Sequence, residues 1–596
     1  MSLPNLEHKR TTQGDNRHLL VLYGSQTGTA EDVAQQISRG ARRLHFSTEV
    51  ASMDSYQHQK IFEVDLVIFV CSTTGQGTEP QNMTRFWKAL RRADLPNDFF
   101  YGIKFTVFGL GDSSYPKFNW VAKKLYRRLL QIGAECFYLR GEADDQNSNG
   151  VDSTLLPWLD GLWKALLAAR PLPDGVLPIP LSTCLPPTFK LKLSSSAPND
   201  RSHKALNLSD TKLAKVTKNQ RLTAPQHWQD TRHFEFELSQ QLDFKPGSVC
   251  EILPQNPEEN VVQLLDLMKW ASEADQIFEL SRVESLEELP SGWTRYATLR
   301  EIFRFRLDLS AQPTRSFFEW LSYFSTNPTE AERLREFCSP DGQDDLYEYV
   351  KRPRRTILEV LSEFKSAKIP LDYIHDLFPQ IRPRQFSIAS SSKAFTTQIH
   401  LLVAVVNYKT RLLYPRKGLC TNWLSNLELG TEIELRISSG CFNFPHNSNE
   451  HIICIGPGTG IAPFRSLIQE RALEGSFNNL VIFGCRNEKL DFYYRDEWNR
   501  LEEKGVCRFH WAASRDQVAK RYVQHVVEDH ANDVWNLIGK QNALIFISGS
   551  AGKMPEGVKS ALKRVCMTEG AKTSEEADQF IAQLEVSGRL QEETWS

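Results

Sequence analysis

The sequence has no apolar stretch long enough to cross a membrane. A membrane-spanning helix needs about 18–20 apolar residues, and polar or charged residues interrupt every apolar run before that length. The first 18 residues are polar, carry charges of both signs and lack the apolar centre of a signal peptide. These absences predict a cytoplasmic chain that begins with a polar tail, residues 1–18, and has no membrane anchor.

Cysteine is present but is not arranged in pairs along the sequence. The 11 cysteines are scattered, and no two stand close enough to form a metal-ligand pair. This spacing argues against a zinc site, an iron–sulfur cluster or a disulfide framework, and it favours a reducing compartment. We therefore expect no metal site.

Net charge is also nearly absent. The formal net charge is -2, whereas a nucleic-acid-binding protein usually has a basic domain. The chain does have length, 596 residues, and aromatic side chains, 34 Phe and 13 Trp. Because that length is too great for one hydrophobic core, we expect about three to four domains, and no nucleic-acid partner.

The hydrophobic pattern divides the chain into four regions after the tail. Residues 19–170 alternate apolar strands with amphipathic helices, which is typical of a doubly wound parallel sheet. Residues 171–205 are rich in proline and serine and predict an extended linker. Residues 206–445 predict a β-barrel interrupted by a helical insertion at about 256–379, and residues 446–596 return to strand–helix alternation. The predicted fold class is multidomain α/β.

Eight apolar runs mark the strands expected in the first and last of these regions. The runs are residues 19–23, 66–71, 105–110 and 136–139 in the first region, and 451–455, 480–483, 507–511 and 544–548 in the last.

Three loops rich in glycine and hydroxyl groups follow strands of the first region. In the first loop, backbone N–H groups at a helix N-terminus and nearby hydroxyls can bind a phosphate without a lysine. In the third, Tyr115 is placed to stack on a flat ring. Each loop alone is equally well explained as an ordinary turn, but the three in this order favour one nucleotide site at a single sheet edge. The candidate residues are Ser25, Gln26, Thr27, Gly28, Thr29 and Ala30; Ser72, Thr73, Thr74, Gly75, Gln76 and Gly77; and Leu110, Gly111, Asp112, Ser113, Ser114, Tyr115, Phe118, Asn119 and Asp144.

A second phosphate loop of different composition lies far downstream. Residues 456–460, Gly-Pro-Gly-Thr-Gly, stand between an apolar run and a helical pattern. One chain therefore carries two nucleotide sites of different chemistry, and this order suggests an electron relay.

These motifs resemble those of the diflavin reductases, the family of cytochrome P450 reductase. The three loops resemble the flavodoxin-like FMN domain, and residues 384–390, Arg-Gln-Phe-Ser-Ile-Ala-Ser, resemble the Arg-x-Tyr-Ser motif that binds FAD. Residues 418–421 resemble the second FAD loop, and residues 456–465 closely match the NADPH pyrophosphate loop. The resemblance covers almost the whole chain. It implies a flavodoxin-like domain, an FAD-binding barrel with a helical insertion and a ferredoxin-reductase-like NADP-binding domain, with FMN, FAD and NADPH as cofactors.

The resemblance also assigns roles to individual residues. The implied FAD ligands are Arg384, Gln385, Phe386, Ser387, Gly418, Leu419, Cys420 and Thr421, and the implied NADPH ligands are Gly458, Thr459, Gly460, Ser514, Arg515, Lys520 and Tyr522. A dianionic 2′-phosphate needs a cation, whereas a ribose 2′-hydroxyl would favour an acidic residue, so NADPH is preferred over NADH. The residues implied at the hydride-transfer site are Ser387, Ser548, Glu593 and Trp595, with Trp595 covering the FAD ring. Alternatively, Arg384 and Arg515 are surface charges and Trp595 belongs to a frayed end.

Three positions depart from the commonest pattern of the family. Thr74 stands where a tyrosine that stacks on FMN is frequent, Phe386 replaces the tyrosine beside FAD, and Ser548 replaces a cysteine that faces the nicotinamide. These changes leave the relay intact but put the speed of hydride transfer in question.

The electron acceptor is implied only by the branch of the family that the chain resembles most. Without a membrane anchor or a haem domain, the chain is similar to the cytosolic branch that serves iron–sulfur protein assembly. That branch implies an anamorsin-type iron–sulfur protein as acceptor. The alternatives are the flavoprotein subunit of sulfite reductase and a non-catalytic scaffold that binds nucleotides.

A run of basic residues near the predicted FMN site offers a second indication of the partner. Lys117, Lys123, Lys124, Arg127 and Arg128 lie on or near the helix expected after Tyr115. They predict either a docking patch for an acidic segment of the acceptor or an ordinary solvated helix face.

Overall fold

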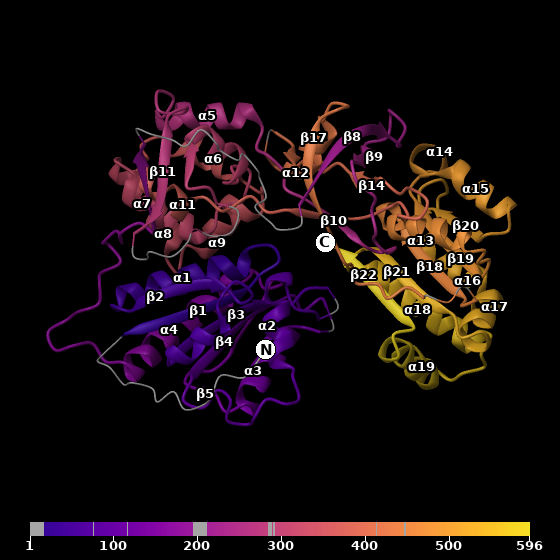
Figure 1. Ribbon diagram of the computed structural model, residues 1–596, viewed down its shortest axis with the longest axis horizontal. Helices are drawn as coiled ribbons and strands as arrows, with labels where there is room; N and C mark the ends of the chain where they lie inside the picture. Colours follow the sequence, from indigo (N-terminus) through magenta and orange to yellow (C-terminus); the bar gives the residue numbers. More distant parts are fainter. Residues whose placement is uncertain are drawn as a thin grey trace. The chain divides into compact units, whose positions relative to one another are not determined.

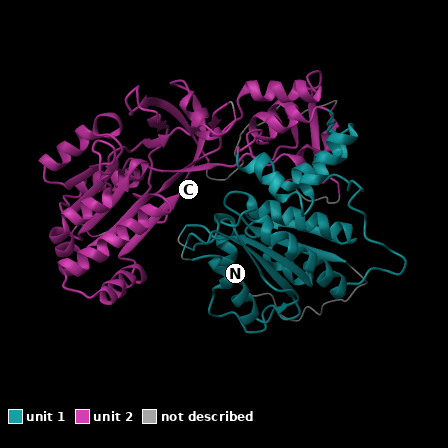
Figure 2. Cartoon of the chain, turned by 180° about the vertical axis from the view of Figure 1, so that it is seen from behind, with its two compact units in different colours: residues 1–187, 313–352, 366–370 teal, residues 188–312, 353–365, 371–596 magenta. Residues whose placement is uncertain are grey.

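The computed structural model describes most of the chain and divides it into two compact units. The described residues are 17–75, 77–115, 117–194, 211–283, 289, 293–412, 414–445, 447 and 449–595. Unit 1 comprises residues 1–187, 313–352 and 366–370, and unit 2 comprises residues 188–312, 353–365 and 371–596 (Figure 2). The insertion predicted at about 256–379 is therefore divided between the two units. None of the described helices combines the length and the apolar character needed to cross a bilayer.

Unit 1 is built on a parallel sheet with helices on both sides (Figure 1). The strand order is β2-β1-β3-β4-β5, and β6 also pairs with β4. The bounds are β1 His18–Gly24, α1 Thr29–Arg43, β2 Ser47–Ser52, β3 Leu66–Ser72, α2 Thr84–Leu90, β4 Lys104–Gly111, α3 Trp120–Gln131, β5 Glu135–Cys136, β6 Gly141–Asp144 and α4 Asp152–Ala169. The order reverses between β1 and β3, and ligands of doubly wound sheets bind at such a switch point.

Apolar side chains on both faces of β1, β3 and β4 explain why these strands are central. One core cluster joins the sheet to α2 and α3, and another joins it to α1 and α4. The apolar runs predicted these three strands to within a residue or two. They missed β2, whose sequence Ser-Thr-Glu-Val-Ala-Ser is polar because it forms an edge. The strand expected at 136–139 is shorter and lies at Glu135–Cys136.

Three helices from the predicted insertion also belong to unit 1. They are α7 Arg315–Phe324, α8 Pro328–Cys338 and α9 Gln343–Leu346. Helix α7 packs beside α1, since the Ser316 hydroxyl donates to Asp32 at 3.1 Å and Arg43 donates to the Tyr323 hydroxyl at 2.9 Å. This part of the insertion therefore folds with the flavodoxin-like sheet.

Unit 2 contains an antiparallel barrel. The strand order is β13-β10-β17-β8-β9-β14, and a bridge between Ile388 and Leu401 brings the last strand back to the first. The bounds are β8 Lys212–Arg221, β9 Thr231–Leu238, β10 Val249–Ile252, β13 Arg384–Ser387, β14 Gln398–Ala404 and β17 Glu432–Ser438, with α12 Leu419–Ser425 before the last of these. Alternate residues of the strands fill one core.

A smaller sheet and several short helices accompany the barrel. The sheet has the order β12-β11-β7, and a two-stranded ladder joins β15 to β16. The bounds are β7 Phe189–Leu193, α5 Glu258–Met268, β11 Ile277–Arg282, β12 Tyr296–Thr298, α6 Leu299–Phe305, α10 Ile357–Glu363, α11 Ile374–Leu377, β15 Asn407–Tyr408 and β16 Arg416–Lys417. Residues 189–193 lie in the predicted linker but form a strand, so that prediction is wrong for this segment. Residues 195–210 lie outside the described part.

The C-terminal part of unit 2 is a parallel sheet covered by helices. Its order is β20-β19-β18-β21-β22. The bounds are β18 Ile452–Pro457, α13 Ala462–Leu473, β19 Asn479–Cys485, α14 Glu488–Asp491, α15 Arg495–Glu503, β20 Arg508–Ala513, α16 Val523–Asp529, α17 Ala531–Trp535, β21 Leu544–Ser550, α18 Lys553–Thr568, α19 Ser574–Val586 and β22 Leu590–Trp595. All four strands predicted here are present, and the C-terminal tail forms the edge strand β22.

Candidate functional site

The loop after β1 is shaped to offer neutral hydrogen-bond donors. The buried Ser25 hydroxyl accepts from the Gly28 N–H at 2.9 Å, and the Ser25 N–H donates to Asn82 at 2.8 Å. Gly28 has a φ of 103° at the N-cap of α1, a conformation that favours glycine. The loop therefore turns sharply into the helix. The hydroxyl groups of Thr27 and Thr29 lie 3.4 Å apart. This geometry suits a phosphate at the helix N-terminus.

The loop after β3 lies beside the loop after β4. The Thr73 N–H donates to the Leu110 carbonyl at 2.9 Å. Thr74 closes a tight turn through its hydrogen bond to the Thr78 carbonyl at 3.0 Å, with Gly75 and Gly77 at positive φ. Gln76 lies outside the described residues. The structure thus brings the first three predicted loops to one sheet edge, after β1, β3 and β4.

The loop after β4 leaves one buried acceptor without a partner. Asn119 is fully buried and left-handed, and its amide donates to the Ala143 carbonyl at 2.9 Å, while its Oδ1 has no partner among the described residues. Ser113 donates its N–H to Asp144 at 2.9 Å, which joins this loop to β6. Although burial acts to raise the pKa of Asp144, hydrogen bonds from Ser113 and Gln146 hold it below its usual value. Tyr115 is half-buried at the same edge.

Strand β13 carries the predicted FAD motif. Arg384 is exposed, and Phe386 packs against the barrel core opposite Cys250. Gln385 points to the other face, where it donates to the buried Glu251 at 3.0 Å. Arg436 and Ser438 of β17 also donate to Glu251, at 2.8 and 2.9 Å. This buried ion pair holds β13 in place from behind the motif.

The second predicted FAD loop begins helix α12. Gly418 is close to Val406, since a Cβ on Gly418 would lie 2.7 Å from the Val406 Cβ. The Thr421 hydroxyl accepts from the Val406 N–H at 2.9 Å, so its proton remains for another acceptor. Leu419 is half-buried and Cys420 is buried, and burial raises the pKa of that thiol to about 12.

The predicted NADPH pyrophosphate loop follows β18 and passes close to β21. A Cβ on Gly460 would lie 2.0 Å from the Ser548 carbonyl oxygen, so only glycine fits there. Gly458 has a φ of 58°, and Thr459 begins the turn into α13 with it. Arg465, the last residue of the matched motif, has a structural role: it donates to the Ala389 carbonyl at 2.7 Å and to Glu497 at 2.8 Å.

The predicted hydride-transfer residues come from three strands. Ser548 and Glu593 are register partners on β21 and β22, so their side chains share one face of the sheet. Ser387 hydrogen-bonds Glu593, and burial raises the pKa of Glu593 to about 7 against that bond. The Ser548 Oγ and one oxygen of Glu593 are buried with no partner among the described residues. Trp595 lies at the end of β22, is 38% exposed, and accepts a hydrogen bond from the Ala551 N–H through its carbonyl.

The residues predicted for the 2′-phosphate follow β20. Ser514 is buried, whereas Arg515, Lys520 and Tyr522 are exposed on the loop that leads to α16. Asp516, the acidic residue of this loop, accepts from Asn487 at 2.8 Å and from the Glu488 N–H at 2.7 Å. Its carboxylate is thereby held by its own neighbours and leaves the cations of the loop accessible.

Models of known protein families match each of the three sheet-containing regions of the chain. The flavodoxin model matches residues 21–158, the FAD binding domain model residues 206–423 and the oxidoreductase NAD-binding domain model residues 454–560. The chain is 43% identical to "NADPH-dependent diflavin oxidoreductase 1" of Danio rerio over 97% of its own length and 99% of the relative's. Relatives of the same name in Mus musculus and Schizosaccharomyces pombe are 41% and 38% identical, over 97% of this chain and 99% and 100% of theirs.

The chain belongs to the NADPH-dependent diflavin oxidoreductases. It is an oxidoreductase with FMN, FAD and NADPH as cofactors, and the family resemblance, the fold class and the cofactors expected from the sequence are confirmed. The residues that hold each cofactor remain predictions.

The residues present fit the three cofactors. The buried oxygens of Asn119, Ser548 and Glu593 that have no partner among the described residues each lie in a predicted cofactor site, where a cofactor would supply a partner. In this family the flavins, when bound, accept two electrons from NADPH and release them singly. Glu593 can hold or release a proton near neutral pH, because burial raises its pKa to about 7.

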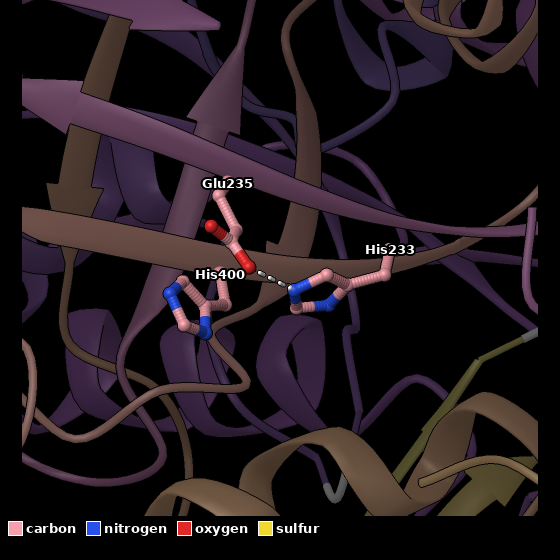
Figure 3. A group of neighbouring side chains, drawn as sticks. All are labelled: His233, Glu235 and His400. Atoms are coloured by element: carbon pink, nitrogen blue, oxygen red, sulfur yellow. Dashed lines mark hydrogen bonds and ion pairs between the residues drawn. The ribbon is translucent and has the colours of Figure 1, made fainter. Parts of the chain in front are cut away.

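Three residues of the barrel form a cluster that the sequence did not single out (Figure 3). The side chains of His233, Glu235 and His400 offer ligand-type atoms within 4.8 Å of one another, and His233 lies 3.0 Å from Glu235. However, Lys218 donates to Glu235 at 3.2 Å and Arg465 lies 3.3 Å from His400, so two cations already approach the groups that a metal would need.

This cluster connects the barrel to the C-terminal sheet. His233 on β9 lies 2.9 Å from the hydroxyl of Tyr494 at the start of α15. Burial lowers the pKa of His233 to about 4, and burial with the Arg465 charge lowers that of His400 to about 3, so both are neutral. We interpret the cluster as a hydrogen-bonded junction.

Other residues near the sites were also missed by the sequence reasoning. Asn82, which holds Ser25, carried no signal. Glu251 did carry one, because it is a lone carboxylate within the apolar strand Val249–Ile252. Two causes raise the pKa of the Cys441 thiol to about 11: first the burial of the thiol, and then the nearby charge of Glu593.

Proposed function

We propose that electrons pass from NADPH to FAD, then to FMN, and then singly to an anamorsin-type iron–sulfur protein in the cytosol, in support of iron–sulfur cluster assembly. One NADPH supplies two electrons, so two acceptor molecules each gain one electron and one proton is released. The match of the whole chain to diflavin oxidoreductases, from residue 21 to residue 560 in the family models, carries this proposal. The acceptor follows from the resemblance to the cytosolic branch.

Individual residues are assigned by the same proposal. Residues 25–30, 72–77 and 110–119 with Asp144 hold FMN; residues 384–387 and 418–421 hold FAD; and residues 458–460, Ser514, Arg515, Lys520 and Tyr522 hold NADPH. Ser387 and Ser548 orient the reacting rings, Glu593 stabilises positive charge on the nicotinamide, and Trp595 covers FAD. The neutral hydrogen-bond donors of residues 25–30 support the assignment of that loop to FMN. The cations Arg515 and Lys520 support the assignment of their loop to NADPH.

The test uses the full-length protein loaded with both flavins. Under anaerobic conditions with NADPH, we expect it to reduce the cluster of an anamorsin-type protein. The loss of the oxidised cluster's absorbance measures this reduction. Ferricyanide serves as a small acceptor, and the haemoprotein subunit of sulfite reductase serves as the competing protein acceptor. Preference for the haemoprotein would replace the proposed acceptor, and a chain that reduces none of the three would be a nucleotide-binding scaffold.

A further inference from the structure

Two arginines follow adjacent strands of the C-terminal sheet. Cys485 of β19 is in register with Ala513 of β20, so Arg486 comes directly after one strand end and Ser514 with Arg515 after the next. The Arg515 N–H donates to the Arg486 carbonyl at 2.8 Å, which ties the two loops together. Because ligands of open parallel sheets bind beyond the carboxyl ends of the strands, these arginines lie where a nucleotide is expected.

An exposed tryptophan from the barrel stacks on the first of these arginines. Trp228 lies in the turn between β8 and β9, and its ring centroid is 4.3 Å from the Arg486 Cζ. The turn itself is fixed to the C-terminal sheet, since the Ala224 N–H donates to the Leu490 carbonyl at 2.8 Å. Trp228 is nevertheless 58% exposed, so burial in a core does not explain its place.

The charges of Arg486 and Arg515 act on each other across the two joined loops. Within the described part of the chain, no carboxylate lies within 4.0 Å of either guanidinium group, and Asp516 is occupied by Asn487 and Glu488. Burial and then the charge of Arg515 lower the pKa of Arg486, whereas Asp491, whose carboxylate accepts from the Arg486 N–H at 2.9 Å, acts in the opposite direction. Two like charges on neighbouring loops favour an anionic ligand.

We propose that Trp228 is a specificity-determining positioning residue, which holds the Arg486 guanidinium beside Arg515 so that both bind the 2′-phosphate of NADPH. The inference rests on the proposed NADPH site at residues 458–460 and 514–522. A planar guanidinium can stack on an indole and still direct its N–H groups in the ring plane toward a phosphate. NADH lacks this 2′-phosphate, so the arrangement would act on coenzyme choice.

The test measures binding of 2′,5′-ADP and of 5′-AMP by titration calorimetry on the flavin-loaded protein. We expect Trp228→Ala to weaken 2′,5′-ADP about two- to fivefold, the range for a solvent-exposed cation–π contact, and to leave 5′-AMP unchanged. Trp228→Phe should retain part of the affinity because it keeps an aromatic face. Phe477→Ala is the matched control, since Phe477 is also 58% exposed and lies in the same unit.

A double-mutant cycle separates positioning from general disturbance. If Trp228 acts through Arg486, Trp228→Ala should have no further effect on 2′,5′-ADP binding in an Arg486→Ala background. Equal weakening of 2′,5′-ADP and 5′-AMP by Trp228→Ala, or unchanged binding of both, would overturn the inference. A wild-type protein that binds the two nucleotides equally would instead overturn the proposed NADPH site, so the two failures can be told apart.

Discussion

The loop after β1 and the pair of loops after β19 and β20 are each proposed to bind a phosphate, but by different means. Residues 25–29 offer backbone N–H groups and hydroxyls at the start of α1, with no lysine or arginine in the loop. The loops after β19 and β20 instead carry Arg486 and Arg515, and they are joined by the hydrogen bond from the Arg515 N–H to the Arg486 carbonyl. FMN always carries its phosphate, so its loop needs only a good fit. NADPH must be distinguished from NADH by one phosphate, and charge makes that difference large.

Loss of one cation should have the largest effect on this contrast. Arg515→Ala removes a charge-assisted contact, which is typically worth about 1.5–3 kcal/mol. We expect the preference for NADPH over NADH in ferricyanide reduction to fall about 10- to 150-fold, while the flavin content stays unchanged. If the preference is unaltered, Arg515 is a surface charge and the contrast between the two loops disappears.

Sequence reasoning located the candidate loops that are continuous in the chain, although their roles remain predictions. The loops after β1, β3 and β4 follow apolar strands and contain glycines with positive φ, such as Gly75 and Gly77. The sequence pattern and the observed backbone conformation therefore agree. Sequence reasoning did not single out Trp228, because a contact with Arg486, over 250 positions away in the sequence, leaves no local pattern.

The same limit explains the errors in the fold. Strand β2 is a polar edge strand, and β7 lies in a proline-rich stretch where its partner β11 is about 85 residues away. Neither has the apolar alternation that marks a strand by itself. The division of the helical insertion between the units was equally invisible, since it depends on contacts such as that of Ser316 with Asp32.

Unlike the neutral donors after β1 and the fixed cations after β19 and β20, Glu593 in the predicted hydride-transfer site changes its charge near neutral pH. Burial raises the pKa of Glu593 to about 7, so the carboxylate forms as the pH rises through 7. Because a carboxylate stabilises positive charge on the nicotinamide, flavin reduction by NADPH in stopped flow should become faster across that step. Glu593→Gln should remove the step and lower the rate at pH 8 about tenfold, as loss of a charged contact of about 1.5 kcal/mol implies.

The raised pKa of Glu593 also predicts a change in stability. The unfolded chain releases this proton near pH 4.5 and the folded chain only near pH 7, so the folded state binds more protons between these values. The free energy of unfolding should therefore decrease as the pH rises from about 4.5 to 7. In Glu593→Gln this part of the decrease should vanish in urea titrations, and an unchanged profile would contradict the assignment.

The C-terminal tryptophan is predicted to add selectivity of another kind. Deleting Trp595 and Ser596 should raise turnover with NADH about two- to tenfold relative to NADPH, because nicotinamide no longer has to displace an aromatic contact of about 0.5–1.5 kcal/mol. The rates with both coenzymes and the flavin spectrum measure this. A deletion that keeps the wild-type preference and spectrum would place Trp595 away from FAD.

The neutral loop should show a smaller effect, limited to FMN. Ser25→Ala removes the acceptor of the Gly28 N–H, and a hydrogen bond of this kind contributes about 1 kcal/mol. We expect FMN retention in dialysis to fall about fivefold, with FAD content and coenzyme preference unchanged. In contrast to NADPH binding, FMN retention should depend little on salt. A steep salt dependence would show that charges outside the loop hold the phosphate.

The basic run beside the FMN loops is only partly available to a partner. Lys123 lies 3.2 Å from Glu142, and Arg128 donates to the Leu90 carbonyl at 2.7 Å. Lys124 donates to the Gly77 carbonyl at 3.3 Å, within the second loop. These three side chains have structural partners, whereas Lys117 and Arg127 are exposed. Reversing Lys123, for example, would disturb the fold of the site as well as any docking surface.

The last and smallest effect concerns these two exposed cations, which would act on association rather than on cofactor binding. Complementary charge mainly raises the rate at which partners meet, and salt screens it. Lys117→Glu with Arg127→Glu should therefore slow electron transfer to the protein acceptor about two- to fivefold at low salt, with a smaller effect at high salt and none on reduction by NADPH. Lys88→Glu with Lys164→Glu, exposed cations on α2 and α4, gives the same change in net charge and is the control. Equal slowing by the control would mean that overall charge steers the acceptor, and equal rates in all variants would make the basic run a solvated helix face.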